Sequence, residues 1–321
     1  MIKVGIIGGA GYTAGELIRI LLTHPKAEIA YIQSTSNGGN PITDVHNDLF
    51  GATDLKFVAD VTFDGIDVIF FCMGHGKAKE FFAKHQVPAS VKVIDLGNDF
   101  RLAKDAGTFV YGLPEVFKSD IKKANHIANP GCFATAIQLS LLPLAAKGLL
   151  KEVHIQATTG STGAGQAPSD TTHFSWRNNN LSVYKAFTHQ HLGEIRQTLV
   201  HLQPDFKADI NFVPLRGNFP RGILASTYLE CDLNLVNAKA LFREYYKDQP
   251  FVFLSDANID LKQVVNTNKC ILYLEKHGNK LLIISIIDNL TKGASGQAVQ
   301  NMNLMFGLPE NEGLSLKSVA F

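Results

Sequence analysis

The sequence predicts an α/β protein of two domains: a Rossmann-type domain with a doubly wound parallel sheet, and an α+β domain with a mixed sheet. Three observations lead to this prediction. The chain has 321 residues, more than one ordinary domain needs. Its first half alternates apolar strands with amphipathic helices, a pattern typical of a parallel sheet covered on both faces. Its second half consists mostly of strand-like runs with few helices between them.

The elements of the first half follow from the apolar pattern. Short apolar runs predict strands at residues 4–8, 28–33, 67–72 and 91–96. Leucine and isoleucine at helical spacing predict a helix over 13–22, which His24-Pro25 ends, and a second helix covers 77–85. A long apolar helix starts near Cys132 and runs to about residue 147.

The pattern then changes. Strands are expected at residues 153–158, 210–215, 223–229, 271–274 and 281–287, with helices at 191–201 and 238–246. A last helix, 294–305, is expected to pack back on the first domain. We therefore predict a first domain of residues 1–147, which residues 293–321 rejoin, and a second domain of residues 148–292.

Composition excludes several classes of protein. Charged residues make up 18% of the chain, the net charge is +1, and Lys and Arg are dispersed, so we expect no nucleic-acid or membrane partner. The four cysteines lie far apart and form no CxxC pair, which indicates reduced thiols in a cytoplasmic protein. The N-terminus lacks a signal-peptide pattern, and no apolar run approaches the ~20 residues of a membrane span.

A glycine-rich turn joins the first strand to the first helix. Its spacing, Gly8-x-x-Gly11-x-x-Ala14, is a variant of the dinucleotide fingerprint, in which backbone N–H groups approach a pyrophosphate at a helix N-terminus. The first domain is therefore predicted to bind a dinucleotide. The expected contacts are Gly8, Ala10, Gly11, Tyr12, Thr13 and Ala14.

The end of the second strand indicates which dinucleotide binds. Residues 33–37 read QSTSN and contain no acid that could bind the ribose 2′-hydroxyl of NAD. A carboxylate would repel a 2′-phosphate, whereas the hydroxyls of Ser34 and Ser36 can hold one. The segment favours NADP(H).

Cys132 is the candidate nucleophile. It follows Asn129-Pro130-Gly131 and stands at the start of a helix, where the dipole and free N–H groups favour a thiolate. Of the 11 histidines, His189 and His191 lie together at a loop-to-helix boundary and are the candidate proton-transfer partners. No further cluster of ligand residues accompanies this pair, so no metal is predicted.

The glycine loop, the NPGC turn and the His-x-His-x-x-Glu-Ile segment, in this order, resemble the N-acetyl-γ-glutamyl-phosphate reductases of the aspartate-semialdehyde dehydrogenase-like superfamily. The likeness covers nearly the whole chain. Further matching segments are DLGNDFRL at 95–102, YGLPE at 111–115, GSTGAG at 160–165, PRGI at 220–223 and DNLTKGASGQA at 288–298. The resemblance implies NADPH-dependent reduction of an acyl phosphate to a semialdehyde in arginine biosynthesis, by a homodimer or homotetramer.

The resemblance also implies roles for individual residues. The second domain would be catalytic and would mediate oligomerisation. Cys132 would attack the acyl phosphate and form a thioester, with His189 or His191 as acid/base. We expect His191 to transfer the proton, since it lies nearer the helix that would hold it. Further residues implied by the resemblance are Arg101, Asn129, Ser161 and Arg221 as substrate contacts, and Gly163, Asn289 and Gly293 as cofactor contacts.

The chain departs from the family pattern at several positions. Ala14 and Gly15 stand where the family has Gly and Ala, Gln190 replaces an arginine, and Ala134 and Gly193 replace prolines. These changes leave the N-acyl group open: acetyl is the default, and a succinyl-glutamyl or an aminoadipyl phosphate is the alternative. YGLPE and His-x-His argue against aspartate-semialdehyde dehydrogenase. The alternative of another class is a non-catalytic NADP-binding regulator, which would tolerate loss of the nucleophile and histidines.

Overall fold

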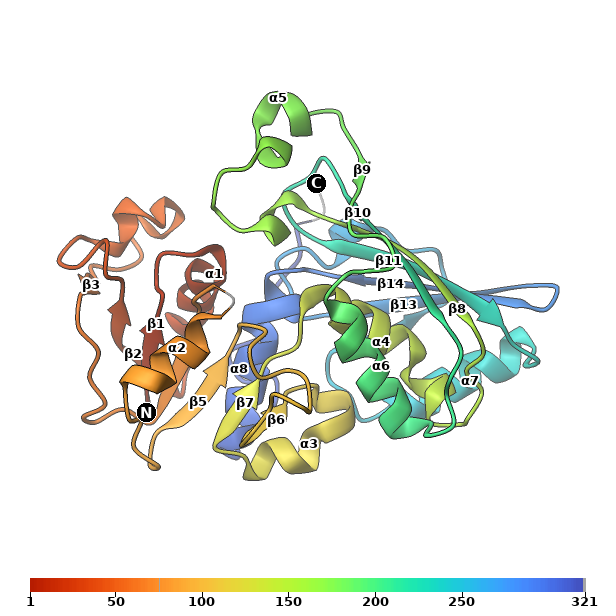
Figure 1. Cartoon of the computed structure of the whole chain (residues 1–321), viewed down its shortest axis with the longest axis horizontal. Coiled ribbons are helices and arrows are strands. Elements are labelled where there is room, and N and C mark those ends of the chain that lie inside the picture. Colours follow the sequence, from red (N-terminus) through yellow and green to blue (C-terminus); the bar gives the residue numbers. More distant parts are fainter. Residues whose placement is uncertain (75, 320–321) are drawn as a thin grey trace. The chain divides into compact units, whose positions relative to one another are not determined.

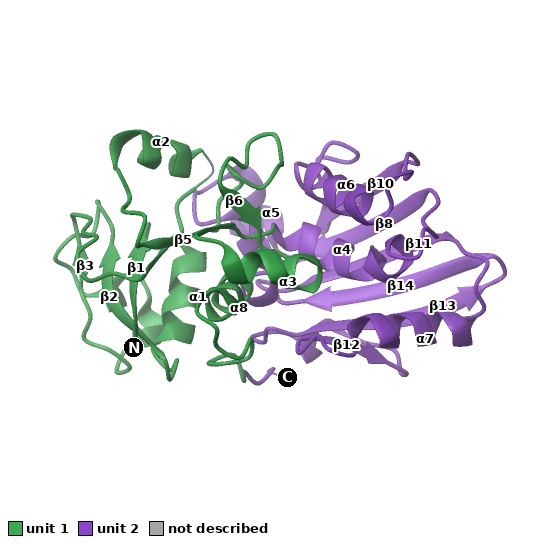
Figure 2. Ribbon diagram, turned by 90° about the horizontal axis from the view of Figure 1, so that it is seen from below, with its two compact units in different colours: residues 1–130, 294–315 green, residues 131–293, 316–321 purple. Residues whose placement is uncertain are grey.

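The computed structural model describes residues 1–74 and 76–319 (Figure 1). They form two compact units: residues 1–130 with 294–315, and residues 131–293 with the C-terminal residues from 316 (Figure 2). The division lies between residues 130 and 131 instead of at the predicted 147. The reason is α4 (Cys132–Ala145), which packs against elements of the second unit.

The first unit is built on seven parallel strands in the order β3-β2-β1-β4-β5-β7-β6. Its strands are β1 (Ile2–Ile7), β2 (Ala27–Gln33), β3 (Phe57–Val58), β4 (Val68–Phe71), β5 (Lys92–Asp95), β6 (Phe109–Tyr111) and β7 (His126–Ala128). Its helices are α1 (Tyr12–Leu21), α2 (Lys77–Lys84), α3 (Pro114–Lys123) and α8 (Gly296–Met305). Figure 2 shows α2 on one side of the sheet and α1 and α8 on the other. The predicted Rossmann-type fold is confirmed.

Apolar packing explains why α2 covers its face of this sheet. The rings of Phe71 on β4 and Phe81 on α2 lie 4.9 Å apart, within one buried cluster of aliphatic and aromatic side chains. On the other side, α8 returns from the distant C-terminal segment and is held by polar contacts. Asn303 lies 3.1 Å from His24, and Ser295 donates to the Thr13 carbonyl at 2.7 Å.

The second unit contains a mixed sheet in the order β12-β13-β14-β11-β8-β10-β9. Its strands are β8 (Val153–Thr159), β9 (Ser182–Val183), β10 (Ile210–Arg216), β11 (Ile223–Glu230), β12 (Val252–Ser255), β13 (Cys270–His277) and β14 (Lys280–Ile287). Besides α4, its helices are α5 (Phe174–Arg177), α6 (His191–Leu202) and α7 (Leu235–Tyr246). Two strand pairs are parallel and four are antiparallel. This confirms the predicted α+β unit with a mixed sheet.

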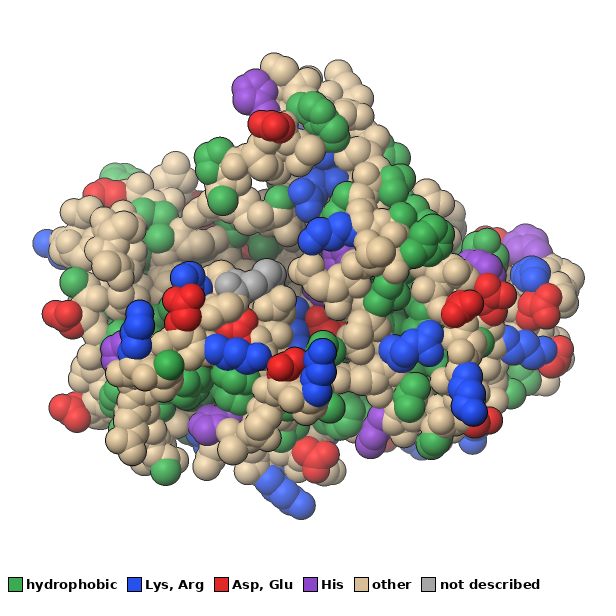
Figure 3. Space-filling view, in the orientation of Figure 1, with side chains coloured by type: hydrophobic (Ala, Val, Ile, Leu, Met, Phe, Trp, Pro, Cys, Tyr) green, Lys and Arg blue, Asp and Glu red, His purple; other side chains and the backbone are tan. Residues whose placement is uncertain are grey.

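Two surface properties bear on function. Lys, Arg, Asp and Glu side chains are interspersed over the face shown in Figure 3, without a large patch of one sign. In the part of the chain that the structure describes, no helix is long and apolar enough to cross a membrane.

Candidate active site

The glycine turn of the first unit is shaped for a ligand. Gly8 follows β1 with φ of +79°, and a Cβ there would lie 2.8 Å from the Met73 side chain, so only glycine fits. A Cβ on Gly11, in contrast, would meet nothing closer than 3.8 Å. Gly11 also precedes α1 without a side-chain cap, which leaves its first turn open to an anion. The turn therefore fits a dinucleotide pyrophosphate.

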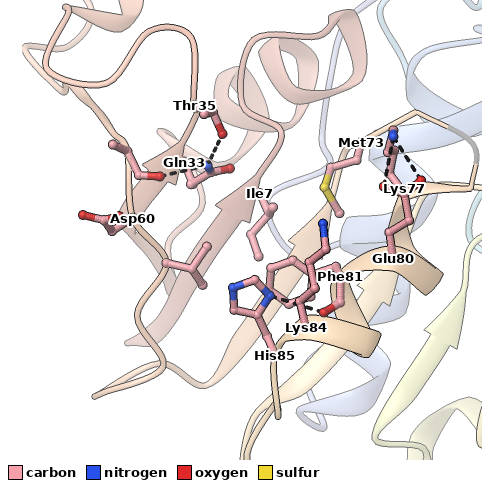
Figure 4. A pocket seen from close by; sticks show the side chains of 12 residues that line it. Ile7, Gln33, Thr35, Asp60, Met73, Lys77, Glu80, Phe81, Lys84 and His85 are labelled. Carbon is pink, nitrogen blue, oxygen red and sulfur yellow. Dashed lines mark hydrogen bonds and ion pairs between the residues drawn. The ribbon is translucent and has the colours of Figure 1, made fainter.

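A cavity of about 420 Å³ lies at the carboxyl ends of the strands in this unit. Such an edge is where ligands bind in open parallel sheets. Figure 4 shows Gln33 and Thr35 on its wall, together with charged side chains that the sequence did not single out: Asp60, Lys77, Glu80 and Lys84. Gln33 donates to Thr35 Oγ1 at 3.1 Å. The cavity thus combines one hydroxyl, that of Thr35, and two lysines beside the predicted 2′-phosphate segment with two acids, Asp60 and Glu80.

The predicted phosphate ligands lie in the turn after β2. Asn37 Nδ2 donates to the hydroxyls of Ser34 and Ser36, each at 3.0 Å. Ser34 is buried and Ser36 is exposed. Of these two predicted ligands, Ser36 is the one exposed to solvent, and the neighbouring Thr35 is exposed as well.

Cys132 is the first residue of α4, as predicted. Gly131 before it is extended (φ −72°, ψ 153°), and its N–H donates to Glu194 Oε2 at 2.9 Å. Cys132 is half-buried, whereas Cys72, Cys231 and Cys270 are buried. Burial raises the pKa of the Cys72 thiol to about 12. Cys132 is thus the thiol that a substrate can reach.

The two histidines meet beside this turn. Their rings lie 4.6 Å apart, and each is only 6% exposed. His189 packs against Phe133, the residue after the cysteine, at 5.5 Å, and its Nδ1 accepts the His191 N–H at 3.2 Å. His191 Nε2 lies 3.8 Å from Glu194 Oε1. Glu194 therefore connects the cysteine turn to the histidine pair.

Burial has a strong effect on His189. It lowers the pKa of His189 to about 4, and the positive charges of Lys185 and Arg216 act in the same direction, against Glu194. Tyr184, whose ring lies 5.7 Å from His189, has its pKa raised to about 12 by burial and by Cys132. Near neutral pH, His189 is therefore a neutral imidazole and Tyr184 a neutral phenol.

The turn after β14 closes against the nucleophile. A Cβ on Gly293 would lie 2.8 Å from the Cys132 Cβ, so only glycine allows this approach. Asp288, which is fully buried, holds the turn: it accepts from the N–H groups of Leu290 and Thr291 and from the guanidinium of Arg221. The predicted substrate contact Arg221 is thus placed in an ion pair of 3.0 Å.

Asn289 connects this turn to the glycine-rich segment after β8. Its Nδ2 donates to Thr162 Oγ1 at 3.0 Å, and its Oδ1 accepts the Gly222 N–H at 2.6 Å. Ser161 and Gly163 lie in the same segment, and the Ser161 N–H donates to the Phe219 carbonyl at 2.8 Å. The predicted residues Ser161, Gly163 and Asn289 therefore lie in two connected turns of the second unit. One of these turns, which contains Gly293, approaches Cys132.

Two predicted substrate contacts belong to the first unit. Arg101 is buried and donates to the Leu96 carbonyl at 2.8 Å. The Asn129 amide donates to the Ala294 carbonyl at 3.0 Å and accepts from Asn301 at 3.1 Å. Their predicted contact with substrate stays a prediction. Among residues 1–74 and 76–319, no group of three His, Cys, Asp or Glu side chains could hold a metal ion.

Comparisons with known proteins show the family and the fold. Residues 3–124 match the family model of the semialdehyde dehydrogenase NAD binding domain, and residues 132–289 match that of the dimerisation domain. The chain is 60% identical to N-acetyl-gamma-glutamyl-phosphate reductases of Parabacteroides distasonis and Flavobacterium johnsoniae, over 100% of each chain. Aspartate semialdehyde dehydrogenase II of Vibrio cholerae is 15% identical, with a TM-score of 0.75 over 96% of this chain and 98% of that one. That likeness shows the fold alone.

Proposed function

The chain belongs to the family of N-acetyl-gamma-glutamyl-phosphate reductases, and from this we propose that it reduces N-acetyl-γ-glutamyl phosphate to N-acetylglutamate 5-semialdehyde with NADPH, releasing phosphate, in arginine biosynthesis. The observation that carries the proposal is the cluster of Cys132, His189 and His191 around Glu194 in the second unit. Covalent acyl transfer needs an accessible thiol that is stabilised as a thiolate, here by the start of a helix, and a nearby imidazole for proton transfer.

Cys132 is the nucleophile in this proposal. Its sulfur bonds to the acyl carbon, the carbon–oxygen bond to phosphate breaks, and a thioester remains. The N-terminus of α4 favours the thiolate and the oxyanion that forms on the attacked carbonyl. Gly293 keeps the facing turn close without a side chain that would occupy the site. Bound NADPH supplies the hydride that reduces the thioester.

His191 is the proton-transfer group, and His189 positions it. A neutral His189 cannot serve as a proton donor near pH 7, but its Nδ1 holds the backbone N–H of His191. Glu194 lies beside the His191 ring and can stabilise an imidazolium there. His191 would then protonate the oxyanion of the thiohemiacetal on Cys132. When the carbon–sulfur bond breaks, this proton returns to His191, the semialdehyde leaves and the Cys132 thiolate is restored.

The first unit holds the cofactor. The open backbone at Gly11 and the uncapped start of α1 favour the pyrophosphate. Ser36 and the lysine Lys84, which lines the cavity at the end of β2, favour the 2′-phosphate of NADPH. The same cavity is also lined by Asp60 (Figure 4).

We propose that the chain forms a homodimer or homotetramer and that it acts in the cytoplasm. The second unit matches a dimerisation domain. Large apolar side chains are exposed along the segment of α5 and β9, which Figure 3 shows at the top: Phe174, Leu181, Val183 and Phe187. Exposed apolar side chains of this kind are typical of interfaces. The four free cysteines fit a reducing compartment.

The test is the reverse reaction. Purified protein is given N-acetylglutamate semialdehyde, phosphate and NADP⁺, and NADPH formation is followed by absorbance. We expect phosphate-dependent turnover that Cys132→Ala abolishes while NADPH binding persists, with Cys231→Ala as the matched buried-cysteine control. Steady-state turnover by Cys132→Ala would rule out the covalent mechanism. Absence of turnover by the unaltered enzyme would rule out the substrate.

A further inference from the structure

Arg216 stands close to the catalytic cluster, although no motif points to it. It is the last residue of β10 and lies on the same face of the sheet as Phe212, because alternate strand residues share a face. Phe212 packs against the His189 ring at 5.5 Å. The guanidinium carbon of Arg216 lies 4.7 Å from the ring centroid of Tyr184, and Tyr184 neighbours His189. One aromatic side chain, Tyr184, therefore separates Arg216 from the His189 imidazole.

The positive charge of Arg216 has no carboxylate partner among residues 1–74 and 76–319. Its buried Nε has no hydrogen-bond partner among these residues either. A second guanidinium, Arg177, is only 7% exposed and donates to the Arg216 carbonyl at 2.7 Å. Burial, and then the charge of Arg216, lower the pKa of Arg177. Two neighbouring cations without a carboxylate favour the binding of an anion.

A neighbouring hydroxyl is also unsatisfied. Thr159 on β8 is the register partner of Arg216, so the two side chains leave the sheet on the same face. Thr159 Oγ1 is buried and has no partner among residues 1–74 and 76–319. Buried polar groups in proteins are nearly always satisfied. Two neighbouring unsatisfied groups beside the active site can therefore form hydrogen bonds with a bound ligand.

We propose that Arg216 forms a carboxylate subsite, which binds a carboxylate of the substrate remote from the reacting carbonyl. The inference rests on the proposed function. That substrate has phosphate on the carbon that Cys132 attacks, so the phosphate lies at the first turn of α4. Arg216 lies beyond Tyr184 and meets a group further along the substrate. The planar guanidinium fork matches a carboxylate in two parallel hydrogen bonds.

Two carboxylates have this chemistry. One is the α-carboxylate of the glutamyl group, and the other is a terminal carboxylate on a dicarboxylic N-acyl group such as succinyl. The reverse reaction distinguishes them, because the semialdehyde and phosphate are separate substrates. Initial rates are measured with N-acetyl- and with N-succinylglutamate semialdehyde, each varied against phosphate, for the unaltered enzyme and for Arg216→Leu and Arg216→Lys.

We expect Arg216→Leu to raise KM for the semialdehyde about ten- to hundredfold, the range for losing a hydrogen bond to a charged group, and to leave KM for phosphate unchanged. Arg216→Lys keeps the charge and most of the volume, so it should raise KM for the semialdehyde less than Arg216→Leu does. If the leucine variant unfolds, the lysine variant is used for the test. A KM rise for both semialdehydes identifies the α-carboxylate. A rise confined to the succinyl compound identifies the acyl carboxylate.

Arg243→Leu is the matched control, because Arg243 lies on the exposed side of α7 and pairs with Asp256. It should change neither KM. The proposal is overturned if Arg216→Leu leaves KM for the semialdehyde unchanged, raises only KM for phosphate, or raises both equally. Failure of the unaltered enzyme to turn over either semialdehyde would instead contradict the proposed function.

Discussion

The division of labour between the two histidines can be tested by replacing each with asparagine. Burial lowers the pKa of His189 to about 4, whereas proton transfer to the thiohemiacetal oxyanion needs a protonated donor. At pH 7, three units above that pKa, about one His189 in 10³ is protonated. This small protonated fraction cancels most of the 10²–10⁴-fold rate enhancement that a positioned acid provides. His189 is therefore a poor proton donor at neutral pH.

The expected magnitudes follow. His191→Asn should lower kcat by about 10²–10⁴-fold, the full contribution of an acid/base. His189→Asn should lower it by about fivefold, because its Nδ1 accepts the His191 N–H at 3.2 Å and one such bond contributes about 1 kcal/mol. Glu194 is left unchanged in both variants.

The assay is kcat in the direction of reduction, at saturating acyl phosphate and NADPH, measured across the pH range where each variant stays folded. His201→Asn serves as the matched control, since His201 is exposed in the last turn of the same helix. A larger loss of kcat for His189→Asn than for His191→Asn would refute the assignment and reverse the two roles.

Three further predictions concern the turn, the cofactor and acid stability. Gly293→Ala should lower kcat by about 10²-fold and destabilise the fold by about 1–3 kcal/mol, because the new Cβ would meet Cys132 at 2.8 Å; unchanged kcat would disprove the close approach. Lys84→Ala should raise KM for NADPH more than for NADH, and an equal rise would place the 2′-phosphate elsewhere. Because the folded pKa of His189 lies below the unfolded 6.5, the fold loses stability as pH falls from about 6.5 towards 4, and His189→Asn should show a smaller loss of Tm between those values.

The sequence predicted most of the long elements because their patterns are local, but it missed the ten-residue helix α3 and the strand β12. Strands β1, β2, β4 and β5 are short apolar runs, and α1, α2 and α6 repeat apolar residues at helical spacing. Strands β3, β6, β7 and β9 were missed because two or three residues cannot establish a period. Their partners, which the sequence does not show, make them strands.

The domain boundary shows a second limit. All residues of α4 after Cys132 are buried, so the helix has no polar face that would indicate which neighbour it covers. Its contacts with α6 and β11 place it in the second unit. Only the three-dimensional arrangement decides such a case.

Some residues of the candidate site could be predicted from the sequence, and others could not. Cys132, Gly8 and Gly11 could be found from the sequence, since a turn before a helix start has a local signature. Arg216 and Tyr184 could not, because their meeting depends on the pairing of β9 with β10 and not on any spacing along the chain.

Arg221 and Arg216 differ in whether a carboxylate of the chain neutralises their charge, and a sequence motif does not show this difference. Arg221 belongs to a segment that resembles the family and was predicted to contact substrate, whereas Arg216 belongs to no motif. Yet Asp288, which is fully buried, takes both a 3.0 Å and a 3.1 Å hydrogen bond from Arg221 and offsets its charge. Removing one partner of such a pair costs about 3–5 kcal/mol, so Arg221 is held by the fold. Arg216 has no such carboxylate in the described chain. Of the two, Arg216 therefore has the charge that a substrate carboxylate can use.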